Sequence, residues 1–115
     1  MINEVSSNPI LTNCIFSSNL ADHRGGGMYN SSSSPTVVNC TFSGNSAGYY
    51  GGGILCHYNS DPTISNCILW GDTAGMDGAE IALSSPDYPS TLTISYSDVA
   101  GGEAAAYVET NCTLN

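Results

Sequence analysis

The chain has 115 residues, a length that suits one domain, and it carries ten acidic residues against one basic residue, Arg24, for a formal net charge of −9. Nucleic acid is not expected as a partner, because phosphate binding depends on Lys and Arg. Membrane insertion is not expected either, because no apolar run approaches about 18 residues. The N-terminus lacks the basic and apolar regions of a signal peptide, so no export signal is expected in this chain.

A repeat of 26 to 30 residues runs along the chain. A shift of 26 superposes Asn13-Cys14 on Asn39-Cys40, and a shift of 27 carries Asn39-Cys40 onto Asn66-Cys67. A further shift of 30 superposes residues 63–65 on 93–95, and its extra residues at 86–91 predict a loop insertion. Three such registers in one short chain predict a solenoid.

Each repeat predicts short strands joined by turns, because no stretch of ten residues combines a 3.6-residue period with helix caps. We therefore expect an all-β fold, a parallel β-helix of three to four coils with 26–30 residues per coil. The whole chain, 1–115, is expected to form a single domain. The expected coils are residues 7–33, 34–60, 61–90 and 91–115, the last with an irregular C-terminal tail.

Stacking the repeats places equivalent side chains above one another at the strand spacing of about 4.8 Å. The expected inward columns are Leu11, Val37, Ile64 and Ile94; Phe16, Phe42, Leu69 and Val99; Met28, Ile54 and Ile81; and Cys14, Cys40, Cys67 and Ser97.

A further column contains Asn13, Asn39 and Asn66, which lie where the chain must bend. Asn tolerates the left-handed backbone region, and its amide can hydrogen-bond along a stack. We expect Asn39 to be buried in this ladder, so its glycosylation sequon, Asn39-Cys40-Thr41, is not expected to be modified.

The cysteine column favours free thiols that pack as small apolar groups over disulfides or a metal site. Side chains stacked in parallel do not readily give the torsion angle of a disulfide. No converging Cys/His arrangement for zinc is present. Cys112, in the tail, is expected to be the most exposed thiol.

The repeat unit resembles that of right-handed parallel β-helix proteins of the pectate-lyase-like superfamily, and most closely the repeats of polymorphic outer-membrane-type surface proteins. The pattern stands here as residues 35–47 followed by Gly51-Gly52-Gly53, and it covers about residues 7–102. The last repeat departs from it at Tyr96 and Ser97. The resemblance implies a right-handed β-helix at the cell surface or in secreted form, and relatives that act on acidic polysaccharides.

The sequence gives little support for a catalytic or metal-binding site. A lyase needs clustered carboxylates for calcium and a basic residue, but Arg24 lies in a turn before a Gly triplet. A hydrolase would draw on Asp72 and Asp98 from successive coils. Calcium is the one candidate cofactor, held by carboxylates along one edge; the candidate ligands are Asp72, Asp77, Glu80 and Glu103. An ice-binding face would use the column of Thr36, Thr63 and Thr93.

The sequence therefore favours a non-enzymatic structural or binding module that forms homo-oligomers through the ends of the solenoid, where strand edges are open. The alternative is a carbohydrate-binding or polysaccharide-cleaving module that uses the lateral face. A lateral groove beside paired carboxylates would favour this alternative, with Tyr49, Tyr50, Tyr58 or Trp70 as its expected lining.

Overall fold

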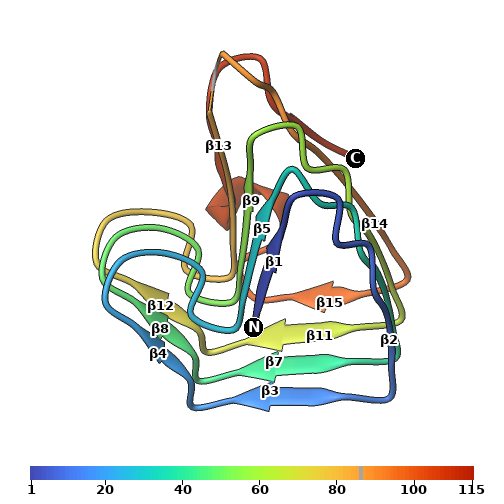
Figure 1. Ribbon diagram of the computed structural model, residues 1–115. Coiled ribbons are helices and arrows are strands. Elements are labelled where there is room, and N and C mark those ends of the chain that lie inside the picture. The colour runs from blue at the N-terminus through green and yellow to red at the C-terminus, as the bar shows by residue number, and fades with distance from the viewer. Residues whose placement is uncertain (86) are drawn as a thin grey trace.

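A computed structural model describes residues 1–85 and 87–115, and over these residues the chain is a parallel β-solenoid of about four coils. Its strands form four parallel sheets, here called A to D, which follow one another around each coil (Figure 1). One short 3₁₀ helix, η1 (Glu103–Ala105), is the exception to the all-β architecture of the described chain. No helix in this part has the length and hydropathy of a membrane span.

The strands of each sheet are stacked in chain order. Sheet A contains β1 (Ile2–Glu4), β5 (Met28–Ser31), β9 (Ile54–His57), β13 (Ile81–Ser84) and β16 (Tyr107–Val108). Sheet B contains β2 (Ile10–Thr12), β6 (Thr36–Val38), β10 (Thr63–Ser65), β14 (Thr91–Ser95) and β17 (Thr113–Leu114). Sheet C contains β3 (Ile15–Ser17), β7 (Thr41–Ser43), β11 (Ile68–Trp70) and β15 (Asp98–Val99). Sheet D contains β4 (Leu20–Ala21), β8 (Ser46–Ala47) and β12 (Thr73–Ala74).

The strand registers place the expected apolar columns one above the other. Phe16 is opposite Phe42, Phe42 opposite Leu69, and Leu69 opposite Val99. The rings of Phe16 and Phe42 stack with centroids 4.6 Å apart. Burial follows position along the axis, since Phe42 is fully buried whereas Phe16, in the first coil, is half-buried.

The column of Asn13, Asn39 and Asn66 has the expected backbone but not the expected burial. Their φ angles are 56°, 54° and 52°, in the left-handed region that Asn tolerates. All three side chains are exposed, so the prediction that Asn39 is a buried ladder residue, and the argument against its glycosylation, were wrong. The bend turns these side chains outward, and the buried asparagines are Asn3, Asn30 and Asn45.

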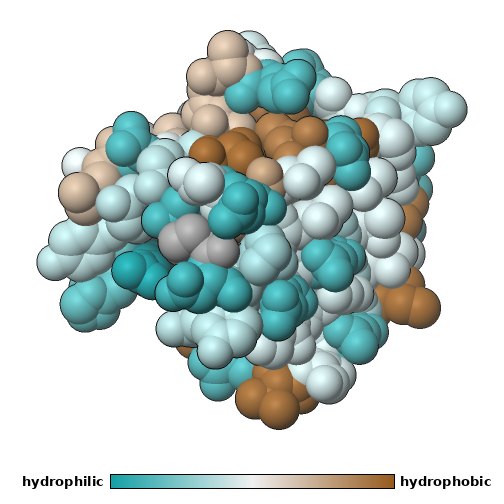
Figure 2. Space-filling view, turned by 90° about the horizontal axis from the view of Figure 1, so that it is seen from above, coloured by the Kyte–Doolittle hydropathy of each residue, from teal (hydrophilic) through white to brown (hydrophobic). Residues whose placement is uncertain are grey.

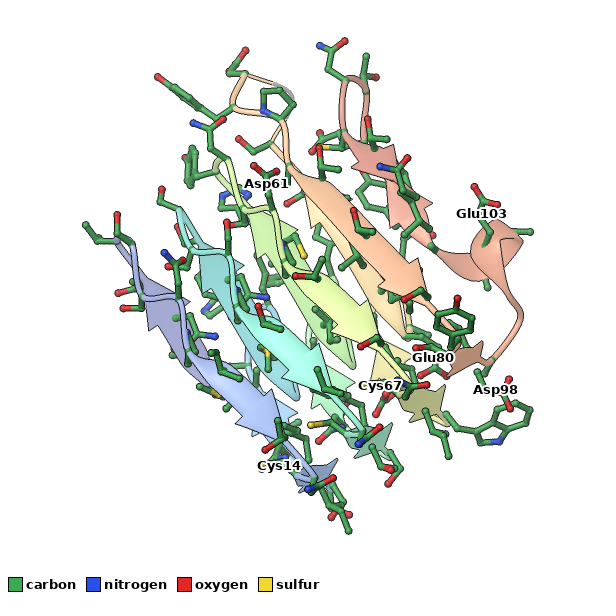
Figure 3. The ribbon with its side chains drawn as sticks, turned by 90° about the vertical axis from the view of Figure 1, so that its right-hand side faces the viewer. Cys14, Asp61, Cys67, Glu80, Asp98 and Glu103 are labelled. Carbon is green, nitrogen blue, oxygen red and sulfur yellow. The ribbon has the colours of Figure 1, made fainter. Side chains whose placement is uncertain are left out.

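The cysteine column forms a ladder at a corner of the coils, in which the sulfur of Cys40 or Cys67 accepts a hydrogen bond from a backbone N–H of the coil before it. The backbone N–H of Cys14 donates to Cys40 Sγ (3.4 Å) and that of Cys40 to Cys67 Sγ (3.3 Å). The N–H of Cys67 donates in turn to Ser97 Oγ (3.0 Å), so the serine substitutes for a fourth thiol. All five cysteines are free, and Figure 3 shows Cys14 and Cys67 at equivalent places on different coils.

Two further corners use the same arrangement with other side chains. Between sheets A and B the N–H of Ser33 donates to Ser60 Oγ, and that of Ser60 to Ser90 Oγ (3.3 and 3.1 Å). Between sheets C and D the N–H of Asn19 donates to Asn45 Oδ1 (3.1 Å), while that of Asn45 donates to Asp72 Oδ1. At these corners, backbone N–H groups that do not bond to a neighbouring strand thus donate to side chains of the next coil.

The tail beyond residue 102 is more regular than the sequence suggests. The strand β16 pairs with β13 and β17 pairs with β14, so sheets A and B continue into a partial fifth coil. The helix η1 lies between β15 and β16 in the chain and is found at the C-terminal end of the stack (Figure 3). The tail therefore covers part of this end, and an apolar hollow of about 380 Å³ remains beside Ile94 and Val99.

The burial gradient along the Phe column gives a stability prediction. Phe42→Ala removes a fully buried ring and leaves a cavity, so its free energy of unfolding should fall by about 3–5 kcal/mol. Phe16→Ala removes a half-buried ring from the first coil and should cost clearly less. Urea unfolding followed by circular dichroism measures both; equal costs for the two variants would contradict the stacking order.

Candidate functional site

A groove of about 390 Å³ lies on the lateral surface beside the ends of the sheet A strands. It has the volume of a small-molecule site. Four tyrosines, a histidine and charged residues of both signs line it. The lining residues are Arg24, Tyr50, His57, Tyr58, Ser84, Ser85, Asp87, Tyr88, Tyr107 and Glu109.

The coils build this groove by stacking corresponding turns. His57 ends β9 and Tyr58 follows it, while Ser84 ends β13, one coil further along, and Ser85 follows it. The tail adds its own contribution, because the Glu109 carboxylate accepts the N–H of Ser85 (2.7 Å) and its backbone N–H donates to the carbonyl of Leu83 (2.9 Å). The expected insertion at 86–91 contributes Asp87 and Tyr88, while Pro86 lies outside the described residues.

The aromatic rings of the groove form two groups. Tyr50 and Tyr107 stack with ring centroids 5.0 Å apart, and the Arg24 guanidinium lies 5.8 Å from the Tyr50 centroid. Tyr58 contacts both His57 and Tyr88, with centroids 4.0 and 5.5 Å apart. Such rings offer apolar faces together with hydroxyl groups that can exchange hydrogen bonds with a ligand.

The pair of His57 and Ser84 does not form an activated nucleophile. His57 Nδ1 lies 3.0 Å from the Ser84 carbonyl oxygen and 3.1 Å from Ser84 Oγ. Because a carbonyl only accepts, Nδ1 carries the proton and cannot take one from the serine hydroxyl. Burial lowers the pKa of His57, and Arg24 lowers it further. The ring is therefore neutral near pH 7 and keeps Nε2 as an acceptor.

Two of the four aromatic residues expected on a lateral groove are present in it. Tyr50 and Tyr58 line the groove, whereas Tyr49 stacks on His23 outside it and Trp70 lies exposed on sheet C. Four other lining residues were not predicted from the sequence: His57, Tyr88, Tyr107 and Glu109. Arg24, which also lines the groove, was expected to be a solvated turn residue. The repeat register already aligned His57 with Ser84, but the place of the tail could not be read from the repeat.

A second cluster consists of two buried carboxyl groups, Asp72 and Glu80, with exposed fractions of 3% and 5%. Asp72 Oδ1 accepts from Asn45, and Glu80 Oε1 accepts from the N–H of Gly71 (2.9 Å). Their other oxygens, Asp72 Oδ2 and Glu80 Oε2, have no donor among the described residues. A protonated Glu80 carboxyl group would supply such a donor.

Burial, together with the hydrogen bond to Asp72 and the negative charge of Asp72, raises the pKa of Glu80 to about 7. Gly53 permits the close approach of Asp72 to the backbone, because a Cβ placed on Gly53 would meet Asp72 Oδ2 at 2.7 Å. Asp72 ends the corner ladder of Asn19 and Asn45, because its Oδ1 accepts from the N–H of Asn45.

The proposed calcium edge is wrong as a cluster of four ligands. Asp72 and Glu80 are together and buried, but Asp77 is exposed beside Tyr50, and Glu103 is exposed on η1, apart from Glu80 (Figure 3). Among the described residues no group of three or more His, Cys, Asp or Glu side chains could hold a metal ion. Asp98 is exposed on the outer face and Asp72 is buried, so these two do not form a hydrolase pair.

The whole chain, residues 1–115, matches the family model described as right handed beta helix region, and the protein belongs to this family. No curated protein and no solved structure matches the chain.

The raised pKa of Glu80 predicts how stability depends on pH. The unfolded chain releases this proton near 4.5 and the folded chain near 7, so the contribution of Glu80 to stability is complete below about pH 4.5 and is lost as pH rises through 7. Glu80→Gln places an amide donor against Asp72 Oδ2. This variant should melt at a higher temperature than the parent above pH 7 and show a flatter pH profile.

Glu103→Gln is the matched control, because Glu103 is an exposed glutamate and its substitution should leave the pH profile unchanged. Melting curves recorded by circular dichroism on both sides of pH 7 make the comparison. A Glu80→Gln profile that runs parallel to that of the parent would contradict the protonation of Glu80.

Proposed function

We propose that the protein is a carbohydrate-binding β-helix module that holds a neutral oligosaccharide in the groove beside sheet A. The observation that carries the proposal is the grouping of four tyrosine rings with hydrogen-bonding and charged side chains in one groove of about 390 Å³. A sugar ring presents C–H faces that pack on aromatic rings, and hydroxyl groups that need both donors and acceptors.

The charges of the groove favour a neutral ligand over an ion. Arg24 contributes one positive charge, and Asp87 and Glu109 contribute negative ones, so both signs face the same space. An anionic polysaccharide would also meet the net charge of −9 of the chain. Sugar hydroxyl groups can instead donate to Glu109 and His57 Nε2 and accept from Arg24.

Binding without cleavage fits the chemistry of the groove better than hydrolysis. His57 Nδ1 is committed to the Ser84 carbonyl, and one oxygen of Glu109 is committed to the N–H of Ser85. Glu80, whose pKa is raised as in general acids, is buried beside Asp72, and neither residue lines the groove.

An array of neutral glycans built from glucose, mannose and galactose, followed by calorimetry on the best binder, tests the proposal. At least one neutral oligosaccharide should bind and polygalacturonate should not. Tyr107→Ala removes a stacked ring and should weaken binding by up to roughly tenfold, whereas Tyr96→Ala, an exposed tyrosine outside the groove, should not. Absence of binding to every neutral glycan would overturn the proposal.

Tyr58 gives a separate test because its backbone is strained. Its φ of 48° lies in the left-handed region, which is costly for a bulky residue and suits Asn. Tyr58→Asn should therefore raise the free energy of unfolding by about 1 kcal/mol while it weakens glycan binding. Urea unfolding and calorimetry on the same preparation measure both effects, and a variant that loses stability would show that Tyr58 serves packing instead.

A further inference from the structure

We propose that two copies of the chain associate through their N-terminal ends to form a closed, two-fold symmetric dimer. The inference is independent of the groove and rests on the shape, the apolar side chains and the charge of the first coil. An end that pairs with its own kind gives a dimer, whereas an end that pairs with the opposite end gives a fibre.

The first coil carries apolar side chains on its outside as well as its inside. Each of its strands has one strongly exposed apolar residue; these are Ile2, Ile10, Ile15 and Leu20, with exposed fractions of 70–77%. In the second coil the residues in register with them are Tyr29, Thr36, Thr41 and Ser46. An apolar residue on the outside of every strand therefore distinguishes the first coil from the second, although Ile68 and Trp70 are exposed on the third.

The interior of the first coil is also incompletely covered. Leu11, Cys14 and Phe16 face the core but remain half-buried, while their neighbours Val37, Cys40 and Phe42 in the second coil are buried. No described residue covers the outer edges of β1, β2, β3 and β4, which end their sheets. An end with free strand edges and an apolar cross-section is a template for association.

The C-terminal end has a different shape, so it is a poor partner for this surface. Within the described residues sheets A and B hold five strands each, sheet C four and sheet D three, which makes that end stepped. The N-terminal end is level, because β1 to β4 belong to the same coil. A level end that meets a stepped one leaves a void over part of the contact, whereas two level ends can meet closely.

The charge distribution also favours contact between two N-terminal ends. Residues 61–115 contain eight of the ten acidic residues and no basic one, whereas residues 1–60 contain Glu4, Asp22 and Arg24. Contact between two N-terminal ends buries neither Asp98 nor Glu103 and keeps the two acidic halves far apart. The principal extents of 30 × 28 × 24 Å bound an end face to several hundred Å², near the roughly 800 Å² per partner of a stable interface.

Size-exclusion chromatography with light scattering over a wide concentration range tests this proposal. The mass should rise to that of a dimer and stop there. Ile15→Glu places a charge among the exposed apolar residues of the first coil and should give a monomer at every concentration. Ile68→Glu, in the same outward column two coils away, should still give the dimer.

Tyr96→Glu distinguishes the two ends, because Tyr96 is 89% exposed and lines the hollow at the C-terminal end. This variant should remain dimeric. Species that grow beyond the dimer, or loss of association in Tyr96→Glu, would show head-to-tail stacking and overturn the proposal. A parent chain that stays monomeric at all concentrations would overturn it as well.

Discussion

Three of the four corners of each coil, those between sheets A and B, B and C, and C and D, leave backbone N–H groups that side chains of the next coil accept, whereas the glycine corner between sheets D and A uses backbone carbonyls. Thiols do this in the column of Cys40 and Cys67, hydroxyls in that of Ser60 and Ser90, and an amide and a carboxylate in that of Asn45 and Asp72. An unsatisfied buried N–H costs about 1–3 kcal/mol, so each coil depends on the one that follows it. This dependence explains why small polar residues recur at fixed spacing inside an otherwise apolar core.

The need to bond corner N–H groups also explains the position of the buried carboxyl groups Asp72 and Glu80. Asp72 occupies a ladder position that is Asn45 in the coil before, and its second oxygen then needs a donor, which a protonated Glu80 supplies. The stack also sets the surface, because turns that repeat from coil to coil bring His57 and Ser84 together and leave room for the tail to add Tyr107. The fold and the part of the groove built from stacked turns thus follow from one repeated unit. The face shown in Figure 2 is largely hydrophilic, and its hydrophobic patches are separate from one another.

The repeat was sufficient to predict the fold class, the registers and the inward columns, because a spacing of 26–30 residues fixes which side chains lie above one another. It did not predict which asparagines are buried. Asn39 takes the left-handed conformation itself (φ 54°) and is exposed, whereas Gly44 takes it at the next corner (φ 64°) and leaves Asn45 buried. The groove was only half predicted, since Tyr50 and Tyr58 belong to the repeat whereas Tyr107 and Glu109 arrive from a tail that the repeat does not cover.

The central claim is that side chains of the next coil hold the corner amides, and native-state hydrogen exchange of the Asn19 amide tests it most directly. In the parent chain this proton, which Asn45 Oδ1 accepts at 3.1 Å, should exchange slowly in spite of its position in the first coil. In Asn45→Ala it should exchange much faster, while the amide of Thr41, which donates to the carbonyl of Cys14, should change little. Equal acceleration of the two amides, or none at Asn19, would contradict the account.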